Sequence, residues 1–118
     1  MKVLFLDDDP ARWSSFSKAM VGRAETIWAQ TAIEAIEQLK DNSPFDMIFL
    51  DHDLGGKVYV ASGEGTGWEV AKWIANNITN PPRILIHSMN PVGAKEMKYL
   101  LPNAEVLPFH MLLSALNA

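Results

Sequence analysis

Residues Asp46 to Gly56 read DMIFLDHDLGG and place a short apolar run directly before a polar turn. The run Met47 to Leu50 has the length of one buried strand. Asp51 and Asp53 then enclose His52, and the two glycines that follow end regular structure. Ligands of open parallel sheets bind just beyond the carboxyl ends of the strands. The turn is therefore predicted to form part of a functional site.

On both sides of this central strand, apolar runs alternate with segments of helical periodicity. Strands are predicted at Lys2 to Leu6, Glu25 to Ala29, Met47 to Leu50, Arg83 to Ile86 and Ala104 to Phe109. Helices are predicted after the N-caps Asp9, Thr31, Thr66 and Asn90, and over His110 to Leu116. The inward-facing residues are predicted to be Ile33, Ile36 and Leu39 in the second helix, and Trp68, Ala71, Ile74 and Ala75 in the third.

Strands that alternate with helices predict an α/β fold with one five-stranded parallel sheet, because right-handed crossovers place helices on both faces. Five such units fit a three-layer flavodoxin-like fold, and the first strand lacks the GxGxxG turn of a dinucleotide-binding domain. Residues 1–118 are expected to form a single domain. Segment 57–65 is irregular, and it is predicted to form either a short hairpin or a flap.

The composition argues against nucleic-acid-binding, membrane-spanning and disulfide-bonded classes of protein. The chain has 118 residues, 48% of them hydrophobic, and a net charge of −4 without any basic tract. Binding to duplex nucleic acid or to an anionic membrane is therefore not expected. No apolar run has the length of a membrane span, and the chain has no cysteine for disulfides or thiolate metal sites. These features fit a cytoplasmic protein.

Three of the predicted strands end in side chains that can do chemistry. Asp7 and Asp8 follow the first strand, Asp51 to Asp53 the third, and His87 with Ser88 the fourth. These strand ends should converge on one crevice. Carboxylates in such a crevice repel one another unless a cation lies between them, and oxygen ligands favour a hard cation, Mg²⁺ or else Mn²⁺. Asp9 is explained as the cap of the first helix.

The order of these residues resembles that of the receiver domains of two-component response regulators, over nearly the whole chain. The resemblance implies that Asp7 and Asp8 hold Mg²⁺ and that Asp51 accepts a phosphoryl group. It also implies that the backbone carbonyl of Asp53 binds the metal and that the Ser88 hydroxyl contacts the phosphoryl oxygens. In such a site the metal and the hydroxyl neutralise charge on the transferring group.

The match fails at the end of the chain. Receivers carry a lysine after the fifth strand, usually followed by a proline, whereas residues 104–118 contain no lysine or arginine. The nearest polar candidate is His110, which follows Pro108 and Phe109. A phosphorelay switch without the lysine should signal poorly, so the missing lysine weakens the response-regulator interpretation.

Other residues resemble a divergent branch, the cyclic-phosphate-processing receiver-like domains. His52 lies inside DHDLGG, and the run His87 to Pro91 is followed by Gly93. This resemblance implies hydrolysis of a cyclic phosphate on a nucleotide or an ADP-ribose derivative. The expected partner is therefore a small phosphorylated ligand, and the resemblance to receivers also allows a homodimer.

The residues support that chemistry on their own terms. A cyclic phosphodiester needs an activated water, a charge sink on its nonbridging oxygens and an acid for the leaving hydroxyl. Histidines beside a carboxylate cluster can supply the base and the acid. The predicted roles are Asp8 and Asp51 on the metal, His87 and His52 in proton transfer, and Ser88 with Asn90 on the phosphate.

Two other functions stay open at this point. A stand-alone receiver would take a phosphoryl group on Asp51, and a pseudo-receiver would only bind a partner protein. A phosphatase with Asp51 as nucleophile and Asp53 as acid is a variant of the hydrolytic interpretation.

Overall fold

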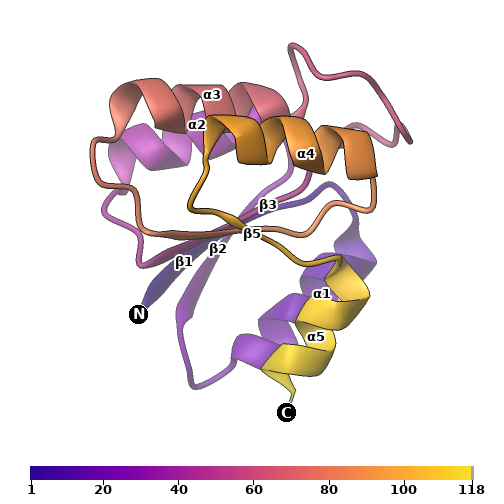
Figure 1. The fold of residues 1–118 in the computed structure, drawn as a ribbon. Coiled ribbons are helices and arrows are strands. Elements are labelled where there is room, and N and C mark those ends of the chain that lie inside the picture. The colour runs from indigo at the N-terminus through magenta and orange to yellow at the C-terminus, as the bar shows by residue number, and fades with distance from the viewer. Residues whose placement is uncertain (118) are drawn as a thin grey trace.

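Five parallel strands form one sheet in the order β2-β1-β3-β4-β5, and a helix follows each strand (Figure 1). The structure is a computed structural model that describes residues 1–117. The strands are β1 (Lys2–Leu6), β2 (Glu25–Ala29), β3 (Met47–Leu50), β4 (Arg83–Ile86) and β5 (Glu105–Val106). The helices are α1 (Pro10–Met20), α2 (Ala32–Asp41), α3 (Gly67–Asn77), α4 (Pro91–Leu100) and α5 (Phe109–Leu116). The predicted three-layer flavodoxin-like fold is confirmed.

The helices cover the two faces of the sheet unequally. Helices α2, α3 and α4 lie on one face, and α1 and α5 lie on the other (Figure 1). Successive residues of a strand point to opposite faces, so Leu4 and Leu6 enter one core while Val3 and Phe5 enter the other. The sheet is therefore buried on both sides, as continuous apolar strands require.

The predicted strands β1 to β4 and the caps Asp9, Thr31 and Asn90 are confirmed. Thr66 precedes α3 as predicted, but its hydroxyl bonds Gly63 and does not cap the helix. The remaining errors concern single faces and ends. Ile33 is 67% exposed, and Ala75 is exposed as well, although both were predicted to face inward. In α2 the buried stripe runs through Ala32, Ala35 and Leu39, because the small alanines allow that side of the helix to approach the sheet. The fifth strand is shorter than predicted, and Phe109 already belongs to α5.

Strand register places three polar residues side by side. Leu6 is the partner of Leu50, and Leu50 is the partner of Ile86. The next residue along each strand is Asp7, Asp51 or His87, and all three are buried. The side chains that can do chemistry thus begin where the apolar strands end, at the edge of the sheet that the sequence predicted.

Two tryptophans connect this edge to the outer layer. The rings of Trp13 and Trp28 stack, with centroids 5.3 Å apart and planes inclined by 7°. The indole Nε1 of Trp28 donates a hydrogen bond to the backbone carbonyl of Asp7 at 2.7 Å. A stacked aromatic pair therefore packs directly beneath the end of β1.

Between β3 and α3 the described chain forms no helix and no strand, so the predicted hairpin is not present. The chain there is held by hydrogen bonds from its backbone N–H groups to the side chains of Asp8 and Asp53. Within residues 1–117, none of the helices is both long and apolar enough to cross a lipid bilayer.

Candidate functional site

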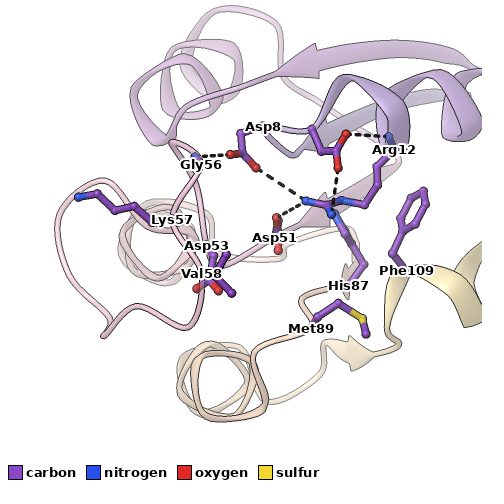
Figure 2. Close-up of a pocket in the computed structure, with 11 residues that line it drawn as sticks. Asp8, Arg12, Asp51, Asp53, Gly56, Lys57, Val58, His87, Met89 and Phe109 are labelled. Atoms are coloured by element: carbon purple, nitrogen blue, oxygen red, sulfur yellow. Dashed lines mark hydrogen bonds and ion pairs between the residues drawn. The ribbon is translucent and has the colours of Figure 1, made fainter.

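A cavity of about 370 Å³ lies beyond the carboxyl ends of β1, β3 and β4 (Figure 2). Four carboxylates line it: Asp8, Asp9, Asp51 and Asp53. Its remaining wall is partly apolar and includes Val58, Met89 and Phe109. The convergence of strand ends that the sequence predicted is therefore present, and it forms a hollow that a ligand can enter.

Arg12, one turn into α1, provides the central cation of the cavity, and the sequence prediction did not include it. Its Nε donates to Oδ2 of Asp7 at 2.8 Å, and its Nη2 donates to Oδ1 of the same residue at 2.9 Å. Nη2 also lies 3.5 Å from Asp51 Oδ2 and 3.8 Å from Asp8 Oδ1. Nη1 lies 3.2 Å from Asp9 Oδ2. Figure 2 shows the guanidinium between Asp8 and Asp51.

Asp7 lies under Arg12 and is fully buried. Its Oδ1 accepts from Arg12 and from the backbone N–H of Asp9, and its Oδ2 accepts from Arg12 and from His87 Nε2. Burial opposes the charged form, but the hydrogen bonds from His87 and Arg12 outweigh burial, so the pKa of Asp7 is lowered. Asp7 is therefore a carboxylate whose four lone-pair directions are all used.

The pKa of Asp51 is shifted in the opposite direction to that of Asp7. The residue is 5% exposed, and burial raises the pKa of its carboxyl to about 6, against the opposing pull of the nearby His87 and Arg12. One oxygen accepts a hydrogen bond from the backbone N–H of His52 at 2.8 Å. A carboxyl group in this condition exchanges protons near neutral pH, as a general acid or base must.

His87 stands beside Asp51 and is 1% exposed. Its Nε2 donates to Asp7 at 3.0 Å, and its ring stacks on Phe5 with centroids 4.9 Å apart. Its Nδ1 has no hydrogen-bond partner among residues 1–117. Buried polar atoms are normally paired, so this nitrogen lacks a partner that a ligand or a water molecule could supply only after a shift of the ring toward the cavity, which His87 lines.

His52 is also predicted as a catalytic residue, but the structure places it behind the cavity wall, fully buried. Its Nδ1 donates to Asp53 Oδ1 at 2.7 Å, and its Nε2 lies 2.9 Å from the Ser62 hydroxyl. That hydroxyl donates to Glu96 at 2.7 Å and therefore accepts from His52. Both ring nitrogens are engaged as donors, so His52 connects the irregular segment to β3 and α4.

Asn90 and Ser88, the predicted phosphate ligands, face this same network. The amide of Asn90 donates to Asp53 Oδ1 and to the Val60 carbonyl, each at 3.1 Å, and its oxygen caps α4 at Gly93. The Ser88 hydroxyl accepts from the backbone N–H of Asn90 at 3.0 Å. Neither residue lines the acidic cavity. His110 is exposed on α5 and does not line the cavity either.

The remaining carboxylates hold the irregular segment over the cavity. Asp53 Oδ2 accepts from the backbone N–H of Tyr59, and Asp8 Oδ2 accepts from that of Gly56, both at 2.6 Å. Hydrogen bonds from His52 and Asn90 overcome the effect of burial and lower the pKa of Asp53. The segment therefore covers the carboxylates in a fixed conformation, which favours a flap over a hairpin.

Two glycines allow these groups to approach. A Cβ on Gly67 would lie 1.7 Å from the carbonyl oxygen of Asp51, and a Cβ on Gly93 would lie 2.4 Å from the ring of His52. Helices α3 and α4 can reach the end of β3 only because these positions carry no side chain. The sequence marks both positions only as glycines near a helix N-terminus.

A divalent cation must compete with Arg12 at this site. One donor atom each from Asp7, Asp51 and His87 lies within 4.8 Å of the others, which is close enough for one ion. The lone pairs of Asp7, however, are already used by Arg12, His87 and Asp9. In this arrangement a guanidinium takes the place at which the sequence predicted Mg²⁺, and the residues do not fit a metal until Arg12 moves.

The model of one protein family, the "Cyclic-phosphate processing Receiver domain", matches residues 2–103. No curated protein matches the chain. Several solved structures with the same fold are described as receiver or response regulatory domains, and at this level of identity they show the fold alone.

Three of them illustrate the likeness. The response regulatory domain of protein mrkE from Klebsiella pneumoniae is 19% identical, with a TM-score of 0.72 over 98% of this chain and 92% of that chain. The signal receiver domain of a Luxo repressor protein described as putative, from Vibrio parahaemolyticus, is 18% identical, with a TM-score of 0.71 over 97% and 85%. A CheY-like receiver domain protein from Methanospirillum hungatei JF-1 is 17% identical, with a TM-score of 0.72 over 97% and 88%.

Proposed function

Because the chain belongs to the cyclic-phosphate processing receiver family, we propose that it hydrolyses a cyclic phosphodiester on a nucleotide or an ADP-ribose derivative. One observation carries the proposal. Arg12 and His87, whose ring has one nitrogen without a hydrogen-bond partner, line the same cavity as a carboxyl group whose pKa burial raises to about 6.

Arg12 is the proposed charge sink. Its planar guanidinium suits the nonbridging oxygens of a phosphodiester, since the N–H groups of Nη1 and Nη2 that do not bond Asp7 can donate to them. Asp7 holds it through two hydrogen bonds, at 2.8 and 2.9 Å, so its orientation is fixed before the ligand arrives. A fixed cation beside the developing negative charge lowers the barrier to attack at phosphorus.

His87 and Asp51 are the proposed proton carriers. A water molecule attacks phosphorus and gives a proton to the free Nδ1 of His87, while Asp7 fixes the ring through Nε2. One ring P–O bond breaks, and the leaving oxygen takes a proton from Asp51. The product is a phosphomonoester with a free hydroxyl, and both residues return to their starting states when the proton passes from His87 to Asp51.

His52, Asp53 and Asn90 act in this proposal as positioning residues. Their hydrogen bonds hold segment 57–65 and thereby shape the cavity. Ser88 acts with them, because its hydroxyl fixes the start of α4. The expected binding of Mg²⁺ or Mn²⁺ stays a proposal for a state in which Arg12 has left Asp7, and no step of the reaction depends on it.

A second candidate is a receiver that accepts a phosphoryl group on Asp51. The position of Asp51 supports it, because the residue follows β3 and lines the cavity. The contact with Arg12 and the lack of lysine or arginine in residues 104–118 weigh against it.

The test is ³¹P NMR of the protein with 2′,3′-cyclic nucleotides and ADP-ribose cyclic phosphate, with and without Mn²⁺. Ring opening by the wild type that falls at least 100-fold in Arg12→Gln, Asp51→Asn and His87→Ala supports the proposal. The control variant Asp41→Asn, on the exposed end of α2, should keep full activity.

If every resonance stays unchanged, hydrolysis of these compounds is refuted. Incubation with acetyl phosphate then separates the alternatives. A new phosphoprotein that is lost in Asp51→Asn identifies a receiver, and no reaction at all leaves a module that binds a partner protein.

A further inference from the structure

A second hollow adjoins the acidic cavity. It has a volume of about 560 Å³ and lies between α4 and the chain around β5, and Met89 lines both it and the cavity. Its other walls include Pro91, Ala94, Val106 and Pro108. This groove therefore borders the proposed active site at one methionine, which Figure 2 shows on the cavity side.

The groove is apolar and open. Met89 is 54% exposed and Val106 is 43% exposed, although both are large apolar side chains. Exposed apolar residues that gather on one patch mark a binding surface more often than isolated ones do. A methionine beside a flat apolar wall is a favourable partner for an aromatic ring, because its polarisable sulfur adapts to the ring.

The acidic cavity alone is small for the whole ligand. Sites for small molecules occupy ~300–1,000 Å³. At about 370 Å³, the cavity suits a phosphate with its sugar, and its four carboxylates do not suit an apolar ring. A ligand that extends past Met89 would place its apolar part in the groove.

Two lysines line the groove in addition. Lys98 is already engaged, since its ammonium donates to the carbonyls of Pro102 and Ala104. Lys95 is exposed and makes no ion pair or hydrogen bond within residues 1–117, so its charge is available to a polar acceptor on the ligand. The groove thus combines an apolar wall with one unpaired cation.

We propose that the groove binds the planar aromatic group of a nucleotide whose cyclic phosphate occupies the acidic cavity. This inference rests on the proposed function and names the part of the substrate that determines specificity. Met89 contacts the ring, Val106 forms the floor of the groove, and Lys95 meets an acceptor on the ring or on a further phosphate.

The test compares adenosine 2′,3′-cyclic phosphate with ribose 2′,3′-cyclic phosphate, which lacks the ring. The wild type should have a kcat/KM at least tenfold higher for the nucleotide. Val106→Trp fills the groove and should reduce this preference below threefold, through a lower kcat/KM for the nucleotide. Val21→Trp is the matched control, because Val21 is 78% exposed at the end of α1 and lies outside the groove and the cavity.

A second measurement does not depend on hydrolysis. Adenosine, which has no phosphate, is titrated into the protein while the methyl resonances of Met89 and Val106 are followed by NMR. Both should shift in the wild type, and the shift of Met89 should be lost in Val106→Trp. If neither cyclic phosphate reacts but adenosine still shifts these methyls, the groove binds the ring and only the proposed reaction fails.

Three results would overturn the inference. They are equal kcat/KM for the two substrates, an unchanged preference in Val106→Trp, and methyl resonances that adenosine does not move. The other possible occupant of the groove is a second copy of the chain, and sedimentation velocity tests for it. A dimer that Val106→Trp dissociates, together with no effect of adenosine, assigns the groove to a second copy of the chain.

Discussion

Arg12 covers both oxygens of Asp7, with Nε donating to Oδ2 and Nη2 donating to Oδ1, and Asp7 in turn receives His87 on the same Oδ2. The buried carboxylate is thus neutralised by a side chain of the protein. The hydrogen bond with Asp7 also raises the pKa of Arg12, so the guanidinium stays charged at every physiological pH. The charge of Asp7 is therefore balanced without a bound ion.

Removing this guanidinium should create a metal site. In Arg12→Gln the carboxylates of Asp7 and Asp51 lose their shared cation, and the repulsion between them favours binding of a divalent ion. We expect the affinity for Mn²⁺, measured by calorimetry, to rise at least tenfold. Arg83→Gln, which removes an exposed guanidinium paired with Glu105, should leave it unchanged. An equal affinity in both variants would show that Arg12 does not compete with metal.

The carboxyl group of Asp51 should make the folded protein less stable as the pH rises. Its pKa is raised from 3.8 to about 6, so between these values the folded state binds more protons than the unfolded state does. The loss across this window is at most about 3 kcal/mol, from about 1.4 kcal/mol per pKa unit.

Asp51→Asn should therefore unfold at a higher temperature than the wild type at pH 7.5, with the difference disappearing near pH 4. Thermal unfolding followed by circular dichroism measures this. Asp41→Asn on the exposed end of α2 is the control and should show no such dependence on pH. A constant difference between Asp51→Asn and the wild type at all pH values would contradict the raised pKa.

Gly93→Ala should destabilise the protein through a steric conflict with His52. The added methyl group would lie 2.4 Å from Cγ of a fully buried ring, so the ring or α4 must shift. Overpacking of this kind costs about 1–3 kcal/mol. Urea denaturation measures the loss, and Gly63→Ala serves as the control, since a Cβ on Gly63 meets nothing within 4 Å. Equal midpoints for the two variants would refute the close packing of α4 on His52.

Ser62→Ala should loosen segment 57–65 without unfolding the protein. The Ser62 hydroxyl bridges His52 and Glu96, and its removal leaves a buried ring nitrogen without an acceptor. A lost hydrogen bond of this kind costs about 1–3 kcal/mol, which corresponds to faster local opening by roughly 5- to 150-fold. Hydrogen exchange of the amides in segment 57–65 should accelerate accordingly.

The control for this variant is Ser17→Ala, which removes an exposed hydroxyl bonded to the carbonyl of Ser14. Hydrogen exchange in segment 57–65 should be the same in this control as in the wild type. If Ser62→Ala also leaves the exchange rates unchanged, the bridge does not hold the segment.

The sequence was sufficient to predict the layers, four of the five strands and the convergence of Asp7, Asp51 and His87, because these follow from apolar runs and their ends. It did not predict Arg12, because a long side chain reaches its partners through the tertiary fold. In the predicted apolar stripe of α2, Ile36 and Leu39 do pack on the core and only Ile33 is wrong, since the close packing of Ala32 and Ala35 against the sheet is a property of the assembled layers.

The position of His52 could have been predicted from the same pattern. Residues that continue a strand point alternately to its two sides. Asp51 and Asp53 line the cavity, and His52 between them faces away from it, toward Ser62. Its partner Ser62 lies 10 residues further along the chain, and Glu96, to which Ser62 donates, lies 44 residues further than His52, so no local pattern connects them.

The stacked pair of Trp13 and Trp28 gives this site its own optical reporter. Because Trp28 donates to the backbone carbonyl of Asp7, a displacement of that strand end alters the distance or angle between the two indoles. Two indoles this close couple their electronic transitions and produce a paired ellipticity signal whose size depends on that geometry. Binding of a ligand that displaces the end of β1 would therefore change this signal in the unlabelled protein.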